Sequence, residues 1–323
     1  MNELRRNASI EVEEARKSNR TIVFKYGHGS IAEHAVFNFD ILGISRLAVE
    51  ALQSFRLASF TEKSQRYIRI GEDWHLPGEL SGQETVLSEL FACYDQLLSI
   101  LREKGRSSTE AREDARYILP LAVTSQMGMT VNARELEHMI RRMKAHPLAE
   151  VRNLSNALYE AVLPAAPSLM IFTEPTEIDA IAHLQPRPRP GLAKDALLLE
   201  CDTDRRVGEW LEELFGKADF DRVYEGLGIH DALPRSWELF RADFLLNISA
   251  TAYAQLKRHR MSTQLVTAYD PCLGLTIPPA IVEAGCEKLF TGAAERAAEA
   301  AAGLGRAGQY LSPTPTGVRF ACA

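Results

Sequence analysis

The segment FRLASFTEKSQRY, residues 55–67, combines two arginines and two hydroxyl residues whose spacing suits an oxyanion. Arg56 and Ser59 lie three residues apart at an expected helix end, and would share one face. Ser64 and Arg66 lie two apart, which in an extended segment also places them on one face. Guanidinium groups bind oxyanions in bidentate fashion and hydroxyls add donors. The segment therefore predicts a phosphate site, with an exposed helix end bearing ordinary surface arginines as the alternative.

A second cluster, GHGSIAEH at residues 27–34, places potential metal ligands just before an expected strand. His28, Glu33 and His34 offer borderline ligands close together. The spacing of the two histidines, however, fits neither the i, i+4 helical arrangement nor a finger-type pair, and no further His or Cys cluster lies nearby. Metal binding is therefore disfavoured, and a capped turn with hydrogen-bonded histidines is the main alternative to a ligand site.

The third cluster is KRHRMST, residues 257–263. Successive helical residues are about 100° apart, so Arg258 and Arg260 would point to nearly opposite sides of a helix. They would either hold a large ligand that lies across the helix or contact two partners at a subunit interface. Because Leu256 and Met261 flank the arginines, this is not a basic helix of the kind that binds nucleic acid.

Two further segments, EAREDARYILP at 110–120 and TVNARELEH at 130–138, contribute Arg116 and Asn132. Taken alone they indicate two solvated amphipathic helices, with Asn132 as a turn or N-cap residue. The sequence contains no GxSxG elbow, Walker loop or GxGxxG fingerprint, so nucleophilic hydrolysis and the common dinucleotide folds have no support.

Strands and long helices are expected to position these residues. Residues 35–44 alternate as a half-buried strand, and residues 45–56 follow as a helix with Ser45 as N-cap. Further helical patterns cover residues 9–25, 83–104, 108–119, 132–145 and 148–163. The pattern predicts an α/β (α+β) fold.

A strand running into a helix recurs at residues 242–260. At a constant offset of 204 residues (260 minus 56), identical residues fall on one another: Ile44 on Ile248, Ser45 on Ser249, Ala48 on Ala252, Leu52 on Leu256 and Arg56 on Arg260. These identities suggest an internal duplication, although most could reflect shared core chemistry. The segment QPRPRPG, residues 185–191, reads as a semi-rigid linker. We therefore expect one domain over 1–184 and a second, degenerate and shortened, over 192–323.

Composition restricts the class of protein. The chain has 323 residues, 46% of them hydrophobic and 25% charged, and a net charge of −6. These values are typical of a soluble globular protein and argue against nucleic-acid binding. No apolar run is long enough to span a membrane, and the charged N-terminus is not a secretory signal. The five cysteines are scattered and never spaced as CxxC, which fits a reducing cytoplasm.

In order and spacing, five segments over about residues 9–165 resemble the flavin-dependent thymidylate synthase (ThyX) family. That family carries GHxSxxEH before a strand, SR opening a helix, an RHRxxSxxxxSxRY signature, an EARxxLP helix and a TxNAR helix. The corresponding segments here read GHGSIAEH, GISR, SFRLASFTEKSQRY, AREDARYILP and TVNARELEH.

The resemblance implies a ThyX-like domain of mixed sheet and long helices, with active sites between subunits. It also implies FAD as redox cofactor, dUMP as methyl acceptor, and methylenetetrahydrofolate and NADPH as donors, with no protein nucleophile. By position, the residues implied to face FAD are His28, Ser30, Glu33, Asn132 and His138, joined in the second copy by Arg258, His259 and Arg260. Those implied to hold dUMP are Arg56, Glu62, Ser64, Arg66 and Arg116, with Gln255 from the second copy, and the phosphate lies at Ser64, Arg66 and Arg116.

The signature is divided between the two copies. In the first copy its opening Arg-His is replaced by Ser54-Phe55, whereas the second copy keeps residues 258–260 as RHR. The second copy instead has Ala268 and Asp270 at the aligned Ser and Arg positions, and an aspartate would repel a phosphate. We therefore expect a composite site, with the nucleotide on the first copy and the flavin held by the second, in a homodimer that imitates a tetramer. A non-catalytic flavin- or nucleotide-binding homologue, acting as a structural partner, is the alternative.

Overall fold

The computed structural model describes residues 12–18, 20–184, 196–201, 241–313 and 316–322, together with scattered residues between 209 and 238. The expected linker at 185–191 lies outside these residues. The expected helix over 9–25 is represented by helical residues 12–18 and a π-helical turn, Thr21–Lys25. Within the described part of the chain, no helix is both long and apolar enough to cross a membrane.

The first half of the chain is built on a three-stranded antiparallel sheet. Its strands are β1 (Val36–Ser45), β2 (Ala58–Glu62) and β3 (Thr124–Asn132), in the order β1-β3-β2. Along β3 every second residue is buried, as expected for a strand with one face on the core. The buried side chains are Ser125, Met127, Met129 and Val131.

Two helices begin where strands end, each at a side-chain cap. Helix α2 (Arg46–Gln53) starts at Ser45, whose hydroxyl accepts from the Ala48 N–H at 3.0 Å. Helix α5 (Ala133–Lys144) starts at Asn132, whose Oδ1 accepts from the Glu135 N–H at 2.9 Å. Short polar caps satisfy N–H groups that have no partner within the helix. Both expected caps are confirmed.

The remaining helices of the first half lie close to their expected ranges. They are α3 (Glu84–Glu103), α4 (Ser108–Ala115) and α6 (Ala149–Val162), with a 3-10 turn, Arg116–Ile118, after α4. A short helix that was not predicted, α7 (Glu177–Ile181), follows α6. A capping box between Ser107 and Glu110 starts α4. The strand-and-helix composition confirms a mixed fold.

The described residues of the second half form a five-stranded sheet and three helices. The strands are β4 (Ala196–Cys201), β5 (Ala242–Ser249), β6 (Gln264–Val266), β7 (Asp270–Leu275) and β8 (Thr316–Cys322), and the helices are α10 (Ala250–Leu256), α11 (Pro279–Glu283) and α12 (Glu287–Ala301). The order is β4-β5-β8-β6, and β7 pairs with β8. A 3-10 helix, Gly305–Tyr310, follows α12.

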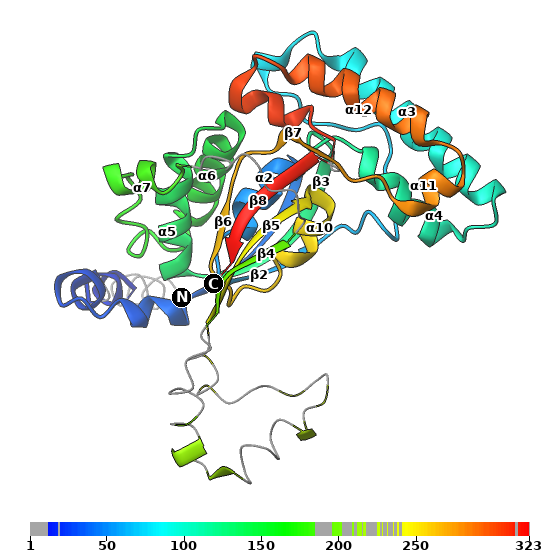
Figure 1. Cartoon of the computed structure of the whole chain (residues 1–323). Helices are drawn as coiled ribbons and strands as arrows, with labels where there is room; N and C mark the ends of the chain where they lie inside the picture. The colour runs from blue at the N-terminus through cyan, green and yellow to red at the C-terminus, as the bar shows by residue number, and fades with distance from the viewer. Residues whose placement is uncertain are drawn as a thin grey trace.

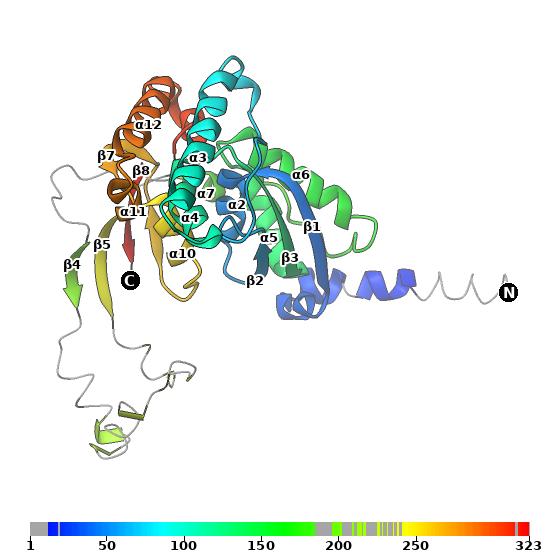
Figure 2. The same cartoon turned by 90° about the vertical axis from the view of Figure 1, so that its right-hand side faces the viewer.

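The two halves share a topology. β5, β8 and β6 lie in the same antiparallel order as β1, β3 and β2. Helix α10 follows β5 at Ser249, whose hydroxyl accepts from the Ala252 N–H at 3.1 Å, as Ser45 does in the first half. The long helices α3 and α12 lie side by side at one end of the molecule (Figures 1 and 2).

Both hydrophobic cores combine residues from the two halves. Tyr269, Tyr310 and Leu311 belong to the core that packs against the first sheet. The second core joins the buried faces of α3 and α12, including Leu97 and Phe290. The expected division into domains at 1–184 and 192–323 stays a prediction, and in the described residues both cores include side chains from the two halves.

Two local expectations were wrong. Helix α2 ends at Gln53, so Arg56 lies in a turn and Ser59 in β2, not together on a helix face. Ser64 and Arg66 lie in a turn and not in an extended segment. The reason is local, because the Ser64 hydroxyl accepts from the Arg66 N–H at 3.3 Å and the Ser64 carbonyl accepts from the Ile68 N–H at 3.2 Å.

The RHR segment is also not helical. Helix α10 ends at Leu256, so the helical argument that Arg258 and Arg260 point to opposite sides does not apply. The Gln264 side chain donates to the Leu256 carbonyl at 3.4 Å and to the His259 carbonyl at 3.3 Å. It thereby adds a second contact to carbonyls that also accept from the His259 and Ser262 N–H groups at 3.0 and 3.2 Å.

Candidate functional site

Ser64, Arg66 and Arg116 form a cationic cluster at the turn after β2 and the end of α4. Arg66 Nη1 lies 3.6 Å, and Arg116 Nη2 lies 4.0 Å, from the same oxygen, Oε1 of Glu113. The Arg112 Nε donates to the Arg66 carbonyl at 2.9 Å and fixes the turn that carries Arg66. Two guanidinium groups therefore converge on one carboxylate, which shows that an oxyanion fits between them.

The field at this cluster is positive. Burial lowers the pKa of Arg116, Glu113 opposes that shift, and the charges of Arg66 and Arg46 add to the lowering. The Arg116 side chain is only 10% exposed, so water screens these charges weakly. An anion that replaced the Glu113 carboxylate would be stabilised by two cations and by the donors of the turn.

Glu62 takes a different place from the one expected for a nucleotide ligand. Its Oε1 accepts from Arg46 Nη1 and, at 3.3 Å, from the Ser125 hydroxyl, while its Oε2 accepts from Gln53 Nε2 at 3.3 Å. Burial would raise the pKa of Glu62, but Arg46 and then Lys257 outweigh burial and lower it. Glu62 is therefore a buried carboxylate that anchors the end of β2 against α2.

Arg56 and Arg260 join the two halves of the chain. Arg56 Nη2 donates to the Ser262 carbonyl at 3.0 Å and to the Thr263 hydroxyl at 3.3 Å. Arg260 Nη1 donates to the Arg56 carbonyl at 3.0 Å and also to the Ala58 carbonyl. Arg56 is thus turned toward the second half and not toward Glu113.

An open depression of about 380 Å³ brings together predicted flavin-facing residues from both halves. Glu33 and Asn132 line it from the first half, with Arg260 from the second and Arg56 between them. Arg134 Nη1 donates to Glu33 Oε1 at 2.5 Å and holds that carboxylate at the entrance to α5. Arg260 of the second half therefore shares this depression with Glu33, Arg56 and Asn132 of the first half.

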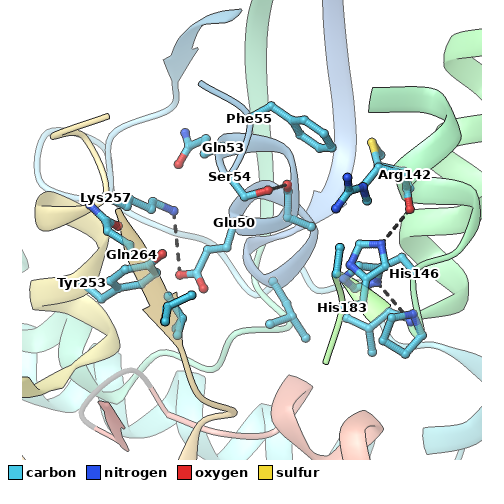
Figure 3. Close-up of a pocket in the computed structure, with 18 of the residues that line it drawn as sticks. Glu50, Gln53, Ser54, Phe55, Arg142, His146, His183, Tyr253, Lys257 and Gln264 are labelled. Atoms are coloured by element: carbon cyan, nitrogen blue, oxygen red, sulfur yellow. Dashed lines mark hydrogen bonds and ion pairs between the residues drawn. The ribbon is translucent and has the colours of Figure 1, made fainter. Parts of the chain in front are cut away.

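A larger cavity of about 480 Å³ lies between the halves (Figure 3). Arg56, His138 and Arg260 are its predicted members. The other charged or titratable residues of its wall were not singled out from the sequence, and they are Glu50, Arg142, His146, His183, Tyr253, Lys257, Tyr269 and Arg306. In Figure 3 the histidines and Arg142 lie on one side, and Glu50, Tyr253 and Lys257 on the other.

Two imidazoles of this cavity, those of His146 and His183, have lowered pKa values. Burial lowers the pKa of His146 to about 3, with contributions from His183 and Arg306. Burial also lowers the pKa of His183, whose Nε2 hydrogen-bonds the Arg142 carbonyl at 2.7 Å. The positive charge of this wall therefore resides on the guanidinium groups, while the imidazoles supply hydrogen-bonding and stacking surfaces.

The remaining predicted residues lie apart from these cavities. His28 and Ser30 are exposed at the start of the 3-10 helix Gly29–His34. Gln255, Arg258 and His259 lie where α10 ends, and neither the cavity nor the depression includes them. Ser64, Arg66 and Arg116 likewise line neither space. Within one chain, the cluster at Ser64, Arg66 and Arg116 is therefore separate from the cavity that contains His138.

The sequence could have predicted that Lys257 is buried and needs an acidic partner. Ala250, Ala254 and Lys257 follow the i, i+4, i+7 spacing of one helix face, and all three are buried. A lysine on an otherwise alanine-lined buried face requires an acidic partner. That partner, Glu50, lies on α2 with its Oε1 at 3.9 Å from the Lys257 Nζ.

Burial makes the stability of the fold depend on Lys257 protonation. Desolvation is the largest of the effects that lower the pKa of Lys257, from 10.5 to about 8. Between these values the unfolded chain binds a proton that the folded chain lacks, so stability rises with pH. Relative to Lys257→Met, wild type is expected to gain up to about 1.4 kcal/mol per pH unit above pH 8. Urea unfolding on both sides of pH 8 measures this difference, and a constant difference would contradict the assignment.

Together the sheet, its capped helices and the arginine-lined spaces define an α+β protein with two neighbouring hollows lined by arginines. Residues 2–168 of the 323 match the family model described as Thymidylate synthase complementing protein (Thy1). The chain belongs to this family, and the resemblance to flavin-dependent thymidylate synthases is confirmed.

Curated relatives agree with this assignment. The chain is 31% identical over 172 residues to the flavin-dependent thymidylate synthase of Clostridium tetani, a match that covers 48% of this chain and 69% of the relative. It is 32% identical over 152 residues to that of Pyrococcus abyssi, covering 45% of this chain and 62% of the relative. Among solved structures, the UMP/dUMP methylase PolB from Streptomyces cacaoi aligns over 49% of this chain and 78% of its own, with 23% identity and a TM-score of 0.42.

Proposed function

We propose that this protein is a flavin-dependent thymidylate synthase that methylates dUMP to dTMP, with FAD as redox cofactor and methylenetetrahydrofolate and NADPH as donors. Family membership supports the class of reaction. The observation that carries the assignment to this chain is the convergence of Arg66 and Arg116 on one carboxylate oxygen, because a nucleotide monophosphate presents oxygens of the same kind.

In this proposal the nucleotide phosphate takes the place of the Glu113 carboxylate. Arg66 and Arg116 supply charge, and Ser64 supplies a hydroxyl from the same turn. Glu62 fixes the end of β2 through its contacts with Arg46 and Gln53. It thereby positions the turn after β2, which carries Ser64 and Arg66, without touching the nucleotide itself. The role of the chain is to place and to stabilise charge, since the proposed reaction needs no protein nucleophile.

The cavity and the depression fit a flavin dinucleotide. They adjoin, because Arg56 and Arg260 line both. Guanidinium groups suit the two phosphates, and the apolar and imidazole wall around His138 suits an aromatic ring. Glu33, Asn132, His138 and Arg260 are the residues that would hold FAD, whose chemistry when bound is the transfer of hydride.

A second copy of the chain would complete the site. The phosphate cluster and the cavity are separate within one chain, so nucleotide and flavin would meet only if another copy brings its own cluster to the cavity. The shared topology of the halves supports an internal duplication with boundaries near 184 and 192, and hence a homodimer that imitates a tetramer. Gln255, Arg258 and His259, which are accessible at the end of α10, are proposed to contribute there. The reaction is proposed to take place in the cytoplasm.

One observation favours a second candidate, a homologue that binds but does not turn over. The first copy has Phe55 where the family signature has a histidine, and the Phe55 ring meets the His138 ring edge-on with centroids 5.6 Å apart. An apolar ring then replaces a hydrogen-bonding one in the cavity wall.

The test is the full-length protein assayed for flavin and for turnover. We expect a flavin absorption band after purification, and release of tritium from dUMP labelled at C5 when NADPH and methylenetetrahydrofolate are added. Flavin without tritium release would favour the binding homologue. A colourless protein that neither binds added FAD nor releases tritium would refute both candidates.

A further inference from the structure

The contacts between the two halves are reciprocal. Arg56 donates to the Ser262 carbonyl, and Arg260 donates to the Ala58 carbonyl. These are the same contact made twice, because 260 minus 56 and 262 minus 58 both equal 204, the offset that relates the two copies. A contact in which residue i meets j while its equivalents meet in reverse is the mark of a two-fold interface. The halves therefore pair as two subunits of a homodimer would.

A two-fold interface between duplicated halves leaves the choice of partner open. Both halves offer the arginine and the carbonyl of this reciprocal contact, so the contact alone would also allow like halves of two chains to pair. Something other than the shared contacts must select the unlike pair.

Three buried residues at this interface break the symmetry. Glu50 on α2 lies with its Oε1 3.9 Å from the Lys257 Nζ, and its Oε2 accepts from the Tyr269 hydroxyl. The side chains of Glu50 and Lys257 are 10% and 5% exposed, and Tyr269 is buried as well. Figure 3 shows Glu50 and Lys257 pointing toward each other on one side of the cavity, beside Tyr253.

The equivalents of these residues do not pair. At the 204-residue offset Glu50 corresponds to Ala254, Lys257 to Gln53, and Tyr269 to Gln65. Two first halves would bury two copies of Glu50 with no cation across the interface. Two second halves would bury two copies of Lys257 against alanine. Burial of a charge without a partner is strongly unfavourable, so both like pairings are penalised.

Among the charges beside this network, Arg46, Arg56 and Arg260 do not make the selection. Arg46 is buried beside the same network, but its guanidinium pairs with Glu62 of its own half. Burial lowers its pKa, and Glu62 with Glu50 outweighs that and raises it. Arg56 and Arg260 donate to backbone carbonyls, which both halves offer alike.

We infer that Glu50, Lys257 and Tyr269 are the residues that make each first half pair with a second half and not with its like. Glu50 recognises the buried ammonium group of Lys257 and the phenol of Tyr269, and the first copy has neither group at the equivalent positions. The inference rests on the proposed duplication and not on the proposed catalysis. As a consequence, the turn that contains residues 258–260 always lies next to β2 of the first half.

Charge reversal in the full-length chain tests this inference. Glu50→Lys and Lys257→Glu each place like charges across the interface and are expected to lower Tm by about 10 °C, the shift that follows from breaking a buried pair. The double variant restores opposite charges and is expected to recover most of that loss. Glu160→Lys, a reversal at an exposed position of α6, is the control and should leave Tm unchanged. The inference would be overturned if the single reversals had the same Tm as the control. It would also be overturned if the Tm of the double variant were no higher than that of the single variants.

Partner choice is tested by mixing. When Glu50→Lys and Lys257→Glu chains are unfolded and refolded together, each first half finds its complement only on the other chain. An equimolar complex of the two variants is expected by native mass spectrometry, and its absence counts against the inference. If the reversals do not fold, Glu50→Gln, Lys257→Met and their combination replace them in the Tm measurement. Strictly additive losses would then contradict the pairing, and a combined loss smaller than the sum supports it. None of these readouts depends on flavin or turnover.

Discussion

Replacing Arg66 with alanine is expected to weaken dUMP binding by between about tenfold and a hundredfold. A charge-assisted hydrogen bond contributes about 1.5–3 kcal/mol, and each 1.4 kcal/mol is about a factor of ten in Kd. Arg116 remains in place in this variant, so binding is weakened and not abolished. The Kd for dUMP, measured by calorimetry at fixed salt concentration, reports the loss.

The control for this prediction is Arg102→Ala. Arg102 is an exposed arginine near the end of α3 and has the same charge, so its removal changes the net charge equally. Its Kd for dUMP should match that of wild type. If Arg66→Ala and Arg102→Ala bound dUMP equally well, the phosphate would lie elsewhere.

Glu150→Ala is expected to lower the free energy of unfolding by about 3–5 kcal/mol. The buried Glu150 carboxylate accepts from the Ser45 N–H at 2.7 Å, the Ser45 hydroxyl at 2.5 Å and the Tyr310 hydroxyl at 2.7 Å. It therefore connects α6 to the start of α2 and to the second half of the chain. Its loss would leave three buried donors without their acceptor.

Urea unfolding measures this effect, with Glu160→Ala on the same helix as the matched control. Glu160 is exposed, and surface substitutions of this kind usually change stability by less than about 0.5 kcal/mol. A Glu150→Ala midpoint equal to that of the control would show that the network does not hold the halves together.

The elements that depend on neighbouring residues could be predicted from the sequence. Ser45 and Asn132 cap helices because each has a short polar side chain next to a periodic apolar run, and the strand over residues 35–44 shows the alternation that the structure confirms. The protein family could also be predicted from the sequence, because that assignment rests on the order of the motifs.

The elements that depend on distant residues could not be predicted in this way. Helix α10 ends at Leu256, and the turn that follows is contacted by the side chain of Gln264, eight residues away from Leu256. Glu50 meets Tyr269 across 219 residues. The cavity around His138 exists only because the second half packs against α2 and α5, so its wall cannot be read from either half alone.

The core that α3 and α12 share has a consequence for the connection between the halves. A single proteolytic cut between Cys201 and Ala242 would separate the chain into two fragments, yet Leu97 and Phe290 would remain buried in one continuous apolar layer. The nicked protein should therefore stay a two-fragment complex that elutes as one species. Once folded, the covalent connection is not what keeps the molecule together, and the two fragments could equally be made from separate genes.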